Sequence, residues 1–401
     1  MTAMKIGIDC HNLEGQRTGV GRYIWNLLKK WLTNPMVGGV EFNLYFKNEI
    51  PQDIEELSYA DDRAQKVAVR SLRAKSNALF KHFYLPRAAK QDKADVLFCP
   101  DYVLPFYVGS LTRHIKTAVA IHDIIYEARP NEYSWPSRSD KILLKWASKQ
   151  SAKKADIIFV PSEFTKDEVL KYYDVDPRKV IITPLAPDPI FQRIMLDKPT
   201  GSGPVGFNVE KKYGITGKFI FFIGSIFNRR FLPEKIQGFS EFAKDHTDFQ
   251  FFIVGNNRTR PFQDIEALVD EANERLGKNA VIWEKYLPDD TDLVLLYNRA
   301  YAVIWLSSYE GFGLPVLESM ACGTPVITSR HGSLPEVAGS AACYVGHPEN
   351  PDEIAEALTR IADDPTYYRE LVEAGYAQAQ RFSWQKTAYE TLRFLNTSHR
   401  A

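Results

Sequence analysis

Short apolar runs of strand length alternate with longer amphipathic runs along the whole chain. Phe219–Ile223 and Ala302–Trp305 are typical of the apolar runs, and Gly21–Leu32 and Asp140–Ala152 are typical of the amphipathic runs, which have helical spacing. Strands that alternate with helices predict parallel sheets with helices on both faces. The predicted strands are Lys5–Ile8, Phe42–Phe46, Val67–Val69, Val96–Cys99, Lys116–Ile121, Ile157–Val160, Val180–Thr183, Phe219–Ile223, Phe249–Val254, Ala280–Trp283, Ala302–Trp305, Pro325–Thr328 and Ala342–Val345.

One interruption divides this alternation. Residues 197–208, DKPTGSGPVGFN, are rich in Pro, Gly and Ser and have little apolar periodicity. We therefore predict an α/β protein with a doubly wound, Rossmann-like domain at 1–196, a linker at 197–217 and a second such domain at 218–382. Ligands of doubly wound sheets bind outside the carboxyl ends of the strands. Two of these domains in tandem predict a binding site in a cleft between them.

The charge balance and the cysteines narrow the class of protein. The chain has 50 basic and 50 acidic side chains, whereas a nucleic-acid-binding protein would more often have a basic excess. Cys10, Cys99, Cys322 and Cys343 form no closely spaced pair, so we expect reduced, buried thiols rather than a zinc site or a disulfide framework. The apolar stretch at the N-terminus is too short for a signal peptide, and no apolar run reaches the length of a membrane span. The sequence therefore predicts a cytoplasmic protein.

The segment at 309–329, YEGFGLPVLESMACGTPVITS, follows a predicted strand and contains the strongest candidate chemistry. Glu310 precedes the glycines of Gly311–Gly313, which let a ligand approach the backbone closely. Pro315 then opens a predicted helix, whose N-terminus directs unpaired N–H groups at the same point and suits a diphosphate. We place Glu318 in about the first turn of this helix, where it and Glu310 could accept hydrogen bonds from sugar hydroxyl groups.

Two further segments follow predicted strands. FIGSIFNRRF contains Arg229 and Arg230, whose guanidinium groups suit a leaving diphosphate, although a surface arginine pair is the alternative. RTGVGRY contains Gly19 and Gly21 but lacks the third glycine of a dinucleotide-binding fingerprint, so that reading is weak. A glycine-rich turn that caps a helix is the alternative for this segment.

These segments resemble the retaining glycosyltransferase family 4, which has the GT-B fold. EGFGLPVLESMACGTPVITS resembles the family's E-x7-E signature, HGSLPEVAGSAACYV its SLPEV segment, and YLPDDTDLVLLYNRAYAVIWLSS the approach to the signature. The resemblance runs from the N-terminus to RFSW at 381–384 and is nearest to bacterial mannosyltransferase-like members. It implies an acceptor-binding first domain and a donor-binding second domain that face each other across a cleft. A C-terminal helix at about 383–401 is expected to pack back on the first domain.

The resemblance also implies roles for individual residues. Glu318 would bind the ribose, Glu310 the transferred sugar, and the basic pair the donor diphosphate together with the backbone amides that follow Glu310. The family usually has Arg-Lys-Asn where this chain has Arg229, Arg230 and Phe231, so the charge is kept but its geometry changes. The expected catalytic residues are His122, Arg229, Arg230 and Glu310, and the expected donor-binding residues are Gly19, Gly21, Gly311, Phe312, Gly313, Leu314 and Glu318.

His122 and the glycines near the N-terminus are assigned mainly by this resemblance. His122 follows the predicted strand Lys116–Ile121 and precedes Asp123, and the family has a histidine in this context that contacts the transferred sugar. A packed, hydrogen-bonded histidine is the alternative. Gly19 and Gly21 match the family's G-x-GRY loop, which lines the cleft near the donor phosphates and the acceptor.

One acidic motif in the second half of the chain could be taken for a metal site. Asp289, Asp290 and Asp292 form DDTD, which looks like a metal-binding motif, but they directly precede an amphipathic run and fit helix N-capping. The family has no obligatory metal. We therefore expect no metal and no cofactor, only a nucleoside diphosphate sugar as donor, with a GDP-sugar favoured over a UDP-sugar.

Basic residues are concentrated in the first half of the chain. From Arg63 to Lys93 there are nine Lys or Arg residues and one acid, Asp92. A solvated helix face is one interpretation, and a peripheral contact with anionic lipid on the inner face of the plasma membrane is the other. Lysines also recur every four residues at Lys141, Lys145, Lys149 and Lys153.

The sequence thus predicts a retaining hexosyltransferase that acts in surface polysaccharide assembly. It would transfer mannose or a related sugar to a glycan or lipid-linked oligosaccharide acceptor. A 2-epimerase or an inverting transferase with the same fold is an alternative, and it would need a dedicated carboxylate base in the first half of the chain. A non-catalytic sugar-nucleotide-binding protein is the other alternative.

Overall fold

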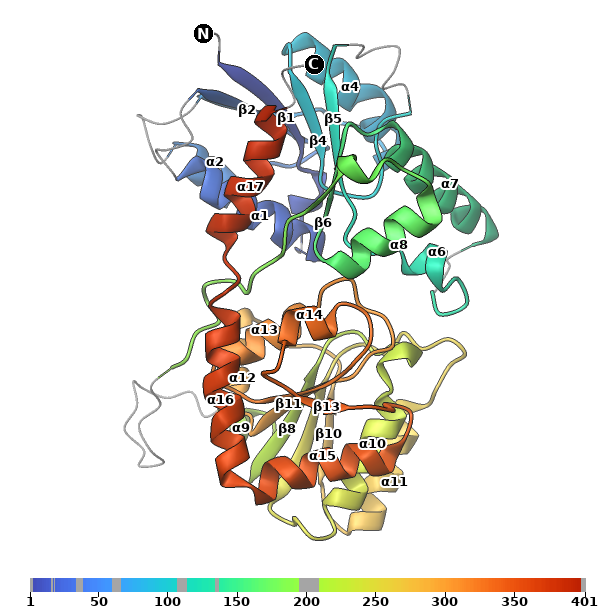
Figure 1. The fold of residues 1–401 in the computed structure, drawn as a ribbon, viewed down its shortest axis with the longest axis vertical. Coiled ribbons are helices and arrows are strands. Elements are labelled where there is room, and N and C mark those ends of the chain that lie inside the picture. The colour runs from blue at the N-terminus through green and yellow to red at the C-terminus, as the bar shows by residue number, and fades with distance from the viewer. Residues whose placement is uncertain are drawn as a thin grey trace. The chain divides into compact units, whose positions relative to one another are not determined.

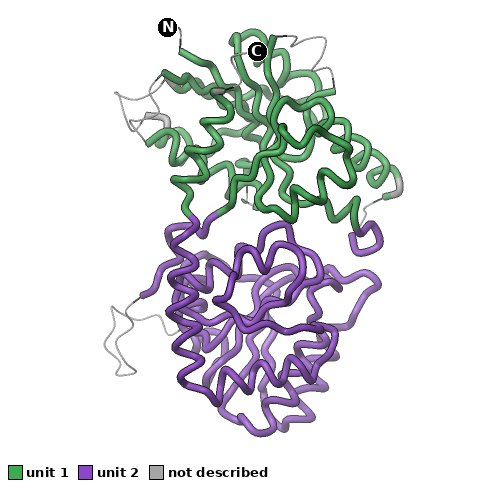
Figure 2. Tube along the Cα trace, in the orientation of Figure 1, with its two compact units in different colours: residues 1–128, 135–185, 383–401 green, residues 129–134, 186–382 purple. Residues whose placement is uncertain are grey.

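The computed structural model describes residues 3–15, 17, 19–33, 39–59, 66–106, 114–133, 137–194 and 209–397. The chain divides into two compact units, which are coloured separately in Figure 2. Unit 1 comprises Met1–Ala128, Trp135–Leu185 and Ser383–Ala401, and unit 2 comprises Arg129–Ser134 and Ala186–Phe382.

Unit 1 is built on a parallel sheet of seven strands in the order β3-β2-β1-β4-β5-β6-β7 (Figure 1). The strand order reverses between β1 and β4, which are hydrogen-bonded neighbours. The strands are β1 (Met4–Asp9), β2 (Val40–Phe46), β3 (Lys66–Ser71), β4 (Val96–Cys99), β5 (Lys116–Ala120), β6 (Ile157–Val160) and β7 (Val180–Ile182). The helices are α1 (Gly19–Leu32), α2 (Gln52–Tyr59), α3 (Asn77–Leu79), the π-helical turn η3 (Phe80–Tyr84), α4 (Leu85–Gln91), α6 (Ile125–Ala128), α7 (Arg138–Lys154), α8 (Glu163–Tyr173) and α17 (Trp384–Thr397), with short 3-10 turns η1 (His11–Leu13) and η4 (Pro177–Lys179).

Unit 2 repeats this plan with a parallel sheet of six strands in the order β10-β9-β8-β11-β12-β13. Here the order reverses between β8 and β11. The strands are β8 (Lys218–Ile223), β9 (Phe249–Val254), β10 (Val281–Glu284), β11 (Ala302–Trp305), β12 (Val326–Ser329) and β13 (Cys343–Val345). The helices are α9 (Val209–Lys212), α10 (Leu232–Phe242), α11 (Ile265–Leu276), α12 (Asp290–Arg299), α13 (Leu314–Ala321), α14 (Leu334–Ala338), α15 (Pro351–Asp363) and α16 (Pro365–Ala379), with the 3-10 turn η5 (Asn228–Arg230).

The apolar alternation of the sequence therefore corresponds to two parallel-sheet, Rossmann-like domains, and each predicted strand is present with ends that differ by at most two residues. The central strands are buried on both faces, as parallel sheets covered by helices require. Cys10, Cys99, Cys322 and Cys343 are unpaired and buried, as expected. In the described part of the chain, no helix has the length and apolarity that spanning a bilayer requires.

The boundary between the units differs from the one that the sequence suggested. The first domain was placed at 1–196, but the structure assigns Arg129–Ser134 and Ala186–Phe382 to unit 2. Of the predicted linker at 197–217, residues 197–208 lie outside the described residues. Residues 209–217 begin with α9 and belong to unit 2. Lys212 and Tyr213 both bond Oδ2 of Asp292 at 2.5 Å, so this segment is fixed to α12.

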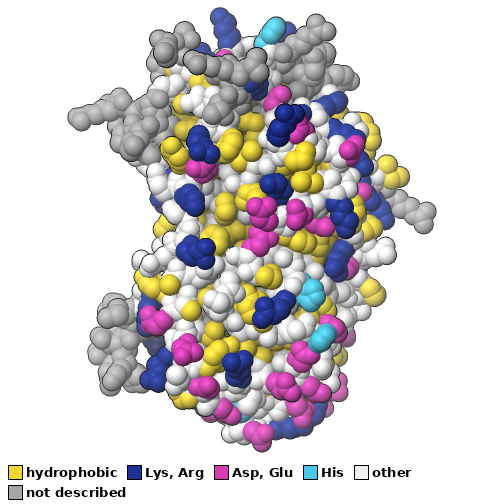
Figure 3. Space-filling view, in the orientation of Figure 1, with side chains coloured by type: hydrophobic (Ala, Val, Ile, Leu, Met, Phe, Trp, Pro, Cys, Tyr) yellow, Lys and Arg dark blue, Asp and Glu magenta, His cyan; other side chains and the backbone are white. Residues whose placement is uncertain are grey.

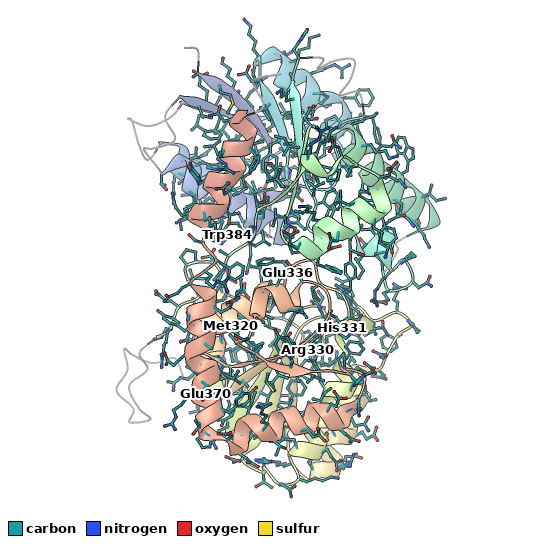
Figure 4. The ribbon with its side chains drawn as sticks, in the orientation of Figure 1. Met320, Arg330, His331, Glu336, Glu370 and Trp384 are labelled. Atoms are coloured by element: carbon teal, nitrogen blue, oxygen red, sulfur yellow. The ribbon has the colours of Figure 1, made fainter. Side chains whose placement is uncertain are left out.

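The C-terminal helix α17 belongs to unit 1, where it packs alongside α1 (Figure 1). The indole nitrogen of Trp31 on α1 donates to the carbonyl oxygen of Ala388 over 2.8 Å. Trp384, at the start of α17 (Figure 4), is buried, and its ring centre lies 6.1 Å from that of Tyr23. Both helices therefore turn aromatic faces toward each other, which is the packing expected of a terminal helix that folds back on the first domain.

Candidate active site

The candidate chemistry of unit 2 lies at the point where the strand order reverses. The loop after β8 contains η5 with Arg229 and Arg230, and the loop after β11 contains Glu310. Since β8 and β11 are parallel neighbours, both loops leave the sheet at the same edge. This edge of a doubly wound sheet is where such folds bind their ligands.

Arg230 and Glu310 form a two-pronged ion pair across this edge. Nε of Arg230 lies 2.9 Å from Oε1 of Glu310, and Nη2 lies 3.3 Å from Oε2. The third guanidinium nitrogen donates to the carbonyl oxygen of Ser225 over 2.8 Å, and the guanidinium plane lies 4.3 Å from the ring centre of Trp305. The two side chains are 11% and 12% exposed, so the pair is nearly buried but still reaches solvent.

The neighbouring arginines also lower the pKa of Glu310. Burial would raise the pKa of Glu310, but the positive charges of Arg230 and Arg229 outweigh burial and lower it. Arg229 lies over the ring of Phe227 and donates from Nε to the carbonyl oxygen of Tyr309 over 3.3 Å. The sequence assigned Glu310 to the sugar and the arginines to the diphosphate, and the structure places all three side chains together.

The backbone after Glu310 is shaped by glycines and by the loop that follows β12. Gly313 has φ +105°, and a Cβ there would lie 2.8 Å from a methyl carbon of Leu334, so only glycine fits. Oγ of Ser333 donates to the carbonyl oxygens of Glu310 and Phe312 over 2.9 and 2.7 Å. This loop also contains His331 (Figure 4), whose buried Nδ1 has no hydrogen-bond partner among the residues that the structure describes.

Helix α13 begins at Leu314, directly after Gly313, with Pro315 at its second position. The N-cap residue Gly313 has no side chain to cap the first N–H groups of the helix, which lie at the positive end of the helix dipole. The helix ends at Ala321, and Gly323 follows in a left-handed conformation. This is the strand–loop–helix arrangement that the sequence predicted for a diphosphate site.

The position of Glu318 along α13 differs from the predicted one. It lies in the second turn of α13 rather than the first, it is 8% exposed, and its Oε2 accepts a hydrogen bond from the Tyr297 hydroxyl over 2.8 Å. The helix begins at Leu314, one residue before Pro315, so Glu318 is its fifth residue and lies just past the first turn.

The predicted residues of the first domain, His122, Gly19 and Gly21, all lie in unit 1. His122 follows β5, and its Nε2 donates to the carbonyl oxygen of Pro100 over 3.1 Å. Burial lowers the pKa of His122, so the ring is neutral and its Nδ1 is left as an acceptor. The glycines lie in the first turn of α1 rather than in a loop. Position 21 requires glycine, because a Cβ there would lie 2.5 Å from the carbonyl oxygen of Asn12.

Both halves of the chain match glycosyltransferase families. Residues 208–378 match the family "Glycosyl transferases group 1", and residues 17–189 match "Glycosyltransferase Family 4". The O-antigen chain mannosyltransferase B of Escherichia coli is 28% identical over 97% of this chain and 98% of its own length. The chain belongs to the family 4-like glycosyltransferases. By this membership and this full-length likeness it is a hexosyltransferase.

Further comparisons agree on the fold. The serotype-specific mannosyltransferase WbdA of Escherichia coli is 29% identical over 75% of this chain but only 37% of its own length. Sucrose-phosphate synthase from Thermosynechococcus elongatus matches 98% of both chains with a TM-score of 0.70 at 18% identity. Anabaena HepE, solved in complex with UDP and glucose, matches 98% of this chain and 100% of its own with a TM-score of 0.71 at 15% identity. These structures establish the GT-B glycosyltransferase fold.

Sequence reasoning missed one charged residue of this glycosyltransferase. Lys235 on α10 is fully buried, with Nζ 3.5 Å from the carbonyl oxygen of Leu306 and 4.1 Å from the ring centre of Phe222. Burial, together with the charge of Arg230, lowers the pKa of Lys235 well below its usual value. Lys235 lies on the apolar stripe of α10, between Leu232 and Phe239, and a lysine on an apolar stripe is the signal that could have revealed it.

The acidic motif DDTD has a structural role in the glycosyltransferase. The carboxylate of Asp289 accepts from the backbone N–H of Asp292 over 2.9 Å and caps α12, as the sequence predicted. The group of His and acidic side chains in the described residues that could hold a metal lies elsewhere, in unit 1, and consists of Asp9, His11 and Asp101.

Proposed function

We propose that this glycosyltransferase transfers mannose or a related hexose from a nucleoside diphosphate sugar to a glycan or lipid-linked oligosaccharide acceptor in surface polysaccharide assembly, with retention of anomeric configuration. The observation that carries the donor side is the pairing of Arg230 with Glu310 at the uncapped start of α13. The full-length likeness to a mannosyltransferase of O-antigen chains supports the sugar and the pathway. A GDP-sugar is favoured over a UDP-sugar, and no metal or other cofactor takes part.

The ion pair would exchange partners when the donor binds. The guanidinium of Arg230 suits a diphosphate oxygen as well as it suits a carboxylate, because both accept its parallel N–H bonds. Glu310 would then be free to accept hydrogen bonds from the hydroxyl groups of the transferred sugar. Arg229, Arg230 and the amides of Gly311–Leu314 would stabilise the charge that grows on the leaving diphosphate.

The remaining roles follow the same division. Glu318 would bind the ribose, and Tyr297 holds its carboxylate in place. His122 would contact the transferred sugar through Nδ1, the nitrogen that Pro100 leaves available. Gly19 and Gly21 would let the donor phosphates or the acceptor approach the start of α1. In a retaining reaction the acceptor attacks from the face of the leaving group, and the diphosphate takes its proton.

Thermal-shift measurements on the full chain with GDP, UDP and their sugars would test the donor. Ligand binding stabilises a fold by mass action, so GDP and GDP-mannose are expected to raise Tm more than UDP and UDP-glucose. A transfer assay with GDP-mannose, read by NMR for the anomeric configuration of the product, tests the reaction. A β-linked product would replace the proposal with an inverting transferase, and binding of nucleotide without transfer would indicate a sugar-nucleotide-binding protein.

We also propose that unit 1 contacts an anionic membrane on the cytoplasmic side. Fewer basic side chains of the run at Arg63–Lys93 are available for lipid than the sequence predicted. Lys81 is buried, Arg70 pairs with Asp92 at 2.6 Å, and 63–65 lie outside the described residues. What supports the contact is a group of exposed apolar side chains near the remaining basic ones. These are Leu79, Phe83 and Tyr84 around η3, and Ile142, Leu143 and Trp146 on α7.

This surface is continuous. Phe106 stacks on His82 of η3 with ring centres 3.7 Å apart and also contacts the ring of Trp146 on α7 at 5.2 Å. Basic and hydrophobic side chains lie side by side along the edge of unit 1 that contains α7 (Figure 3). Two of the predicted lysines are paired, Lys145 with Glu127 and Lys153 with Asp174. Apolar contact would therefore contribute more than charge to lipid binding.

Vesicle sedimentation of the full chain would test this contact. Replacement of both Ile142 and Trp146 by Ser should weaken binding to vesicles of phosphatidylcholine and phosphatidylglycerol by about tenfold or more, because each side chain would bury apolar area in the interface. Phe262→Ser is the matched control, since Phe262 is 74% exposed on unit 2. Equal binding by all three proteins would exclude the contact. No nucleic-acid partner is proposed.

A further inference from the structure

A second group of charged side chains lies in unit 1, at the position that corresponds to Arg230 and Glu310 in unit 2. Asp9 is the last residue of β1, and Asp101 follows β4 after Pro100. The strand order of unit 1 reverses between β1 and β4, as that of unit 2 reverses between β8 and β11. The group therefore lies where a doubly wound sheet is expected to bind a ligand.

The inner part of this group is a closed set of ion pairs. Asp9 is fully buried, and its two oxygens contact Nδ1 of His11 at 2.7 Å and Nζ of Lys81 at 2.5 Å. Lys81 comes from the π-helical turn η3, a rare geometry that recurs at functional sites, and it also donates to Oδ1 of Asp101. Burial raises the pKa of Asp9, but the charges of Lys81 and His11 outweigh burial and lower it.

Lys81 decides what kind of ligand fits. Asp9, His11 and Asp101 offer three ligand atoms close enough for a metal ion, but the ammonium group of Lys81 already contacts both carboxylates. A cation would have to displace Lys81 into a buried space without a partner, which is unfavourable. An anion would meet two carboxylates. A neutral, hydrogen-bonding ligand remains.

The outer part of the group offers such a ligand a donor and an acceptor. Nε2 of His11 lies 3.9 Å from Oδ2 of Asp101, beyond hydrogen-bond distance. Burial would lower the pKa of His11, but the charge of Asp9 and its hydrogen bond to Nδ1 outweigh burial and raise the pKa, which favours the charged ring, whose Nε2 is a donor. The two side chains are 15% and 20% exposed, in contrast to Asp9 and Lys81 behind them.

We propose that His11 and Asp101 together bind one hydroxyl group of the acceptor sugar. Its oxygen would accept from Nε2 of His11 and donate its proton to Oδ2 of Asp101, at about 2.8 Å from each. Asp9 and Lys81 are positioning residues: Asp9 holds the His11 ring, and Lys81 holds the Asp101 carboxylate. This inference rests on the proposed function, because it assigns the acceptor of that reaction to unit 1.

The test uses the full chain, GDP-mannose as donor, and methyl α-mannoside and α-linked mannobiose as acceptor probes. Asp101→Asn and His11→Gln should each raise the acceptor KM by about tenfold or more, because each replaces a charged hydrogen-bond partner of the hydroxyl group by a neutral one. The donor KM and the Tm rise caused by GDP should stay as in the wild type. Asp176→Asn is the matched control, since Asp176 pairs with Arg178 on the surface of unit 1.

A double variant separates binding from a general loss of structure. If both side chains hold the same hydroxyl group, the acceptor KM of the double variant should be close to that of either single variant, because the effects of a shared contact do not add. Monodeoxy versions of methyl α-mannoside add a second readout: one of them should bind the wild type weakly and the variants equally weakly.

Each other result overturns the proposal. An unchanged acceptor KM in both variants excludes the contact. Wild-type protein that is stabilised by GDP but binds neither acceptor probe excludes an acceptor hydroxyl as the ligand. Failure of the wild type to bind any nucleotide would instead refute the proposed function, so the two failures can be told apart.

Discussion

The two units place charged side chains at the same topological position but use them differently. In unit 2 the residues after β8 and β11 form a single pair, Arg230 with Glu310, whose side chains are 11% and 12% exposed. In unit 1, Asp9 at the end of β1, His11 and Asp101 after β1 and β4, and Lys81 of η3 form a network. Asp9 and Lys81 are buried in it, whereas His11 and Asp101 are partly exposed. The pair in unit 2 is open enough for Arg230 to exchange Glu310 for an anionic ligand. In unit 1, the same exchange would leave the buried charge of Asp9 or Lys81 without a partner.

This difference agrees with the proposed division of labour. A donor diphosphate brings two or more negative charges and can replace a carboxylate on Arg230 without loss of charge balance. An acceptor sugar is neutral and can replace nothing in the network of unit 1, so it must bind at its edge. In this proposal the same sheet geometry would provide an exchangeable site for an anion and a fixed site for hydroxyl groups.

The largest expected effect is on the stability of unit 1. Lys81→Met removes the cation between Asp9 and Asp101 and should destabilise the protein by about 3–5 kcal/mol, because it leaves buried carboxylates uncompensated. Denaturant unfolding measures this change. Lys149→Met, a partly exposed lysine on α7, is the control and should have little effect. A Lys81 variant as stable as the wild type would show that the network is not a fixed unit.

Arg230→Ala should affect catalysis more than folding. Loss of the guanidinium from the diphosphate site is expected to lower kcat by about 10²–10³, the range seen when one preorganised donor is removed from a developing charge. Initial rates at saturating donor measure it, with Arg275→Ala as control because Arg275 pairs with Glu241 on the surface of the same unit. A rate within a few-fold of the wild type would mean that Arg230 does not contact the diphosphate.

The sequence predicted the fold more completely than the sites. Periodicity located the strands because the central ones are short apolar runs that are buried on both faces of a parallel sheet. Glu310 and the arginines were found because loops after strands are local in sequence. The pairing of Arg230 with Glu310 was not predictable, since it joins residues 80 positions apart.

The network of unit 1 shows this limit more strongly. Lys81 is 72 positions from Asp9 and was counted among surface lysines, because nothing in its neighbours marks it as buried. Its orientation depends on the π-helical turn η3, which the local pattern does not distinguish from an ordinary helix. Contacts that bring distant segments together at one sheet edge need the tertiary structure.

A smaller effect is expected at Glu318, the second glutamate of unit 2. Tyr297→Phe removes the hydroxyl that donates to Oε2 of Glu318 and should weaken donor binding by about 0.5–1.5 kcal/mol, the usual contribution of one hydrogen bond. The donor KM should rise a few-fold while kcat stays the same, since the ribose lies away from the reacting bond. A fall in kcat with an unchanged donor KM would contradict the assignment of Glu318 to the ribose.

The smallest expected effect is a difference in how the stability contributions of His11 and Glu310 depend on pH. The folded-state pKa of His11 is raised, so its interaction with Asp9 and Asp101 stabilises the protein fully below the unfolded value of about 6.5 and is lost as the pH rises through the folded value. The pKa of Glu310 is lowered, so its contribution is present above its unfolded value and is lost only as the pH falls through the folded one.

The stability difference between wild type and His11→Gln should therefore shrink from about pH 5.5 to about pH 9, whereas that between wild type and Glu310→Gln should stay constant. Urea unfolding at both pH values measures the two differences, and groups such as His122 that are common to both proteins cancel. A constant difference for His11→Gln would mean that His11 is neutral beside Asp9, and its Nε2 would then lack the charge that the acceptor contact assumes.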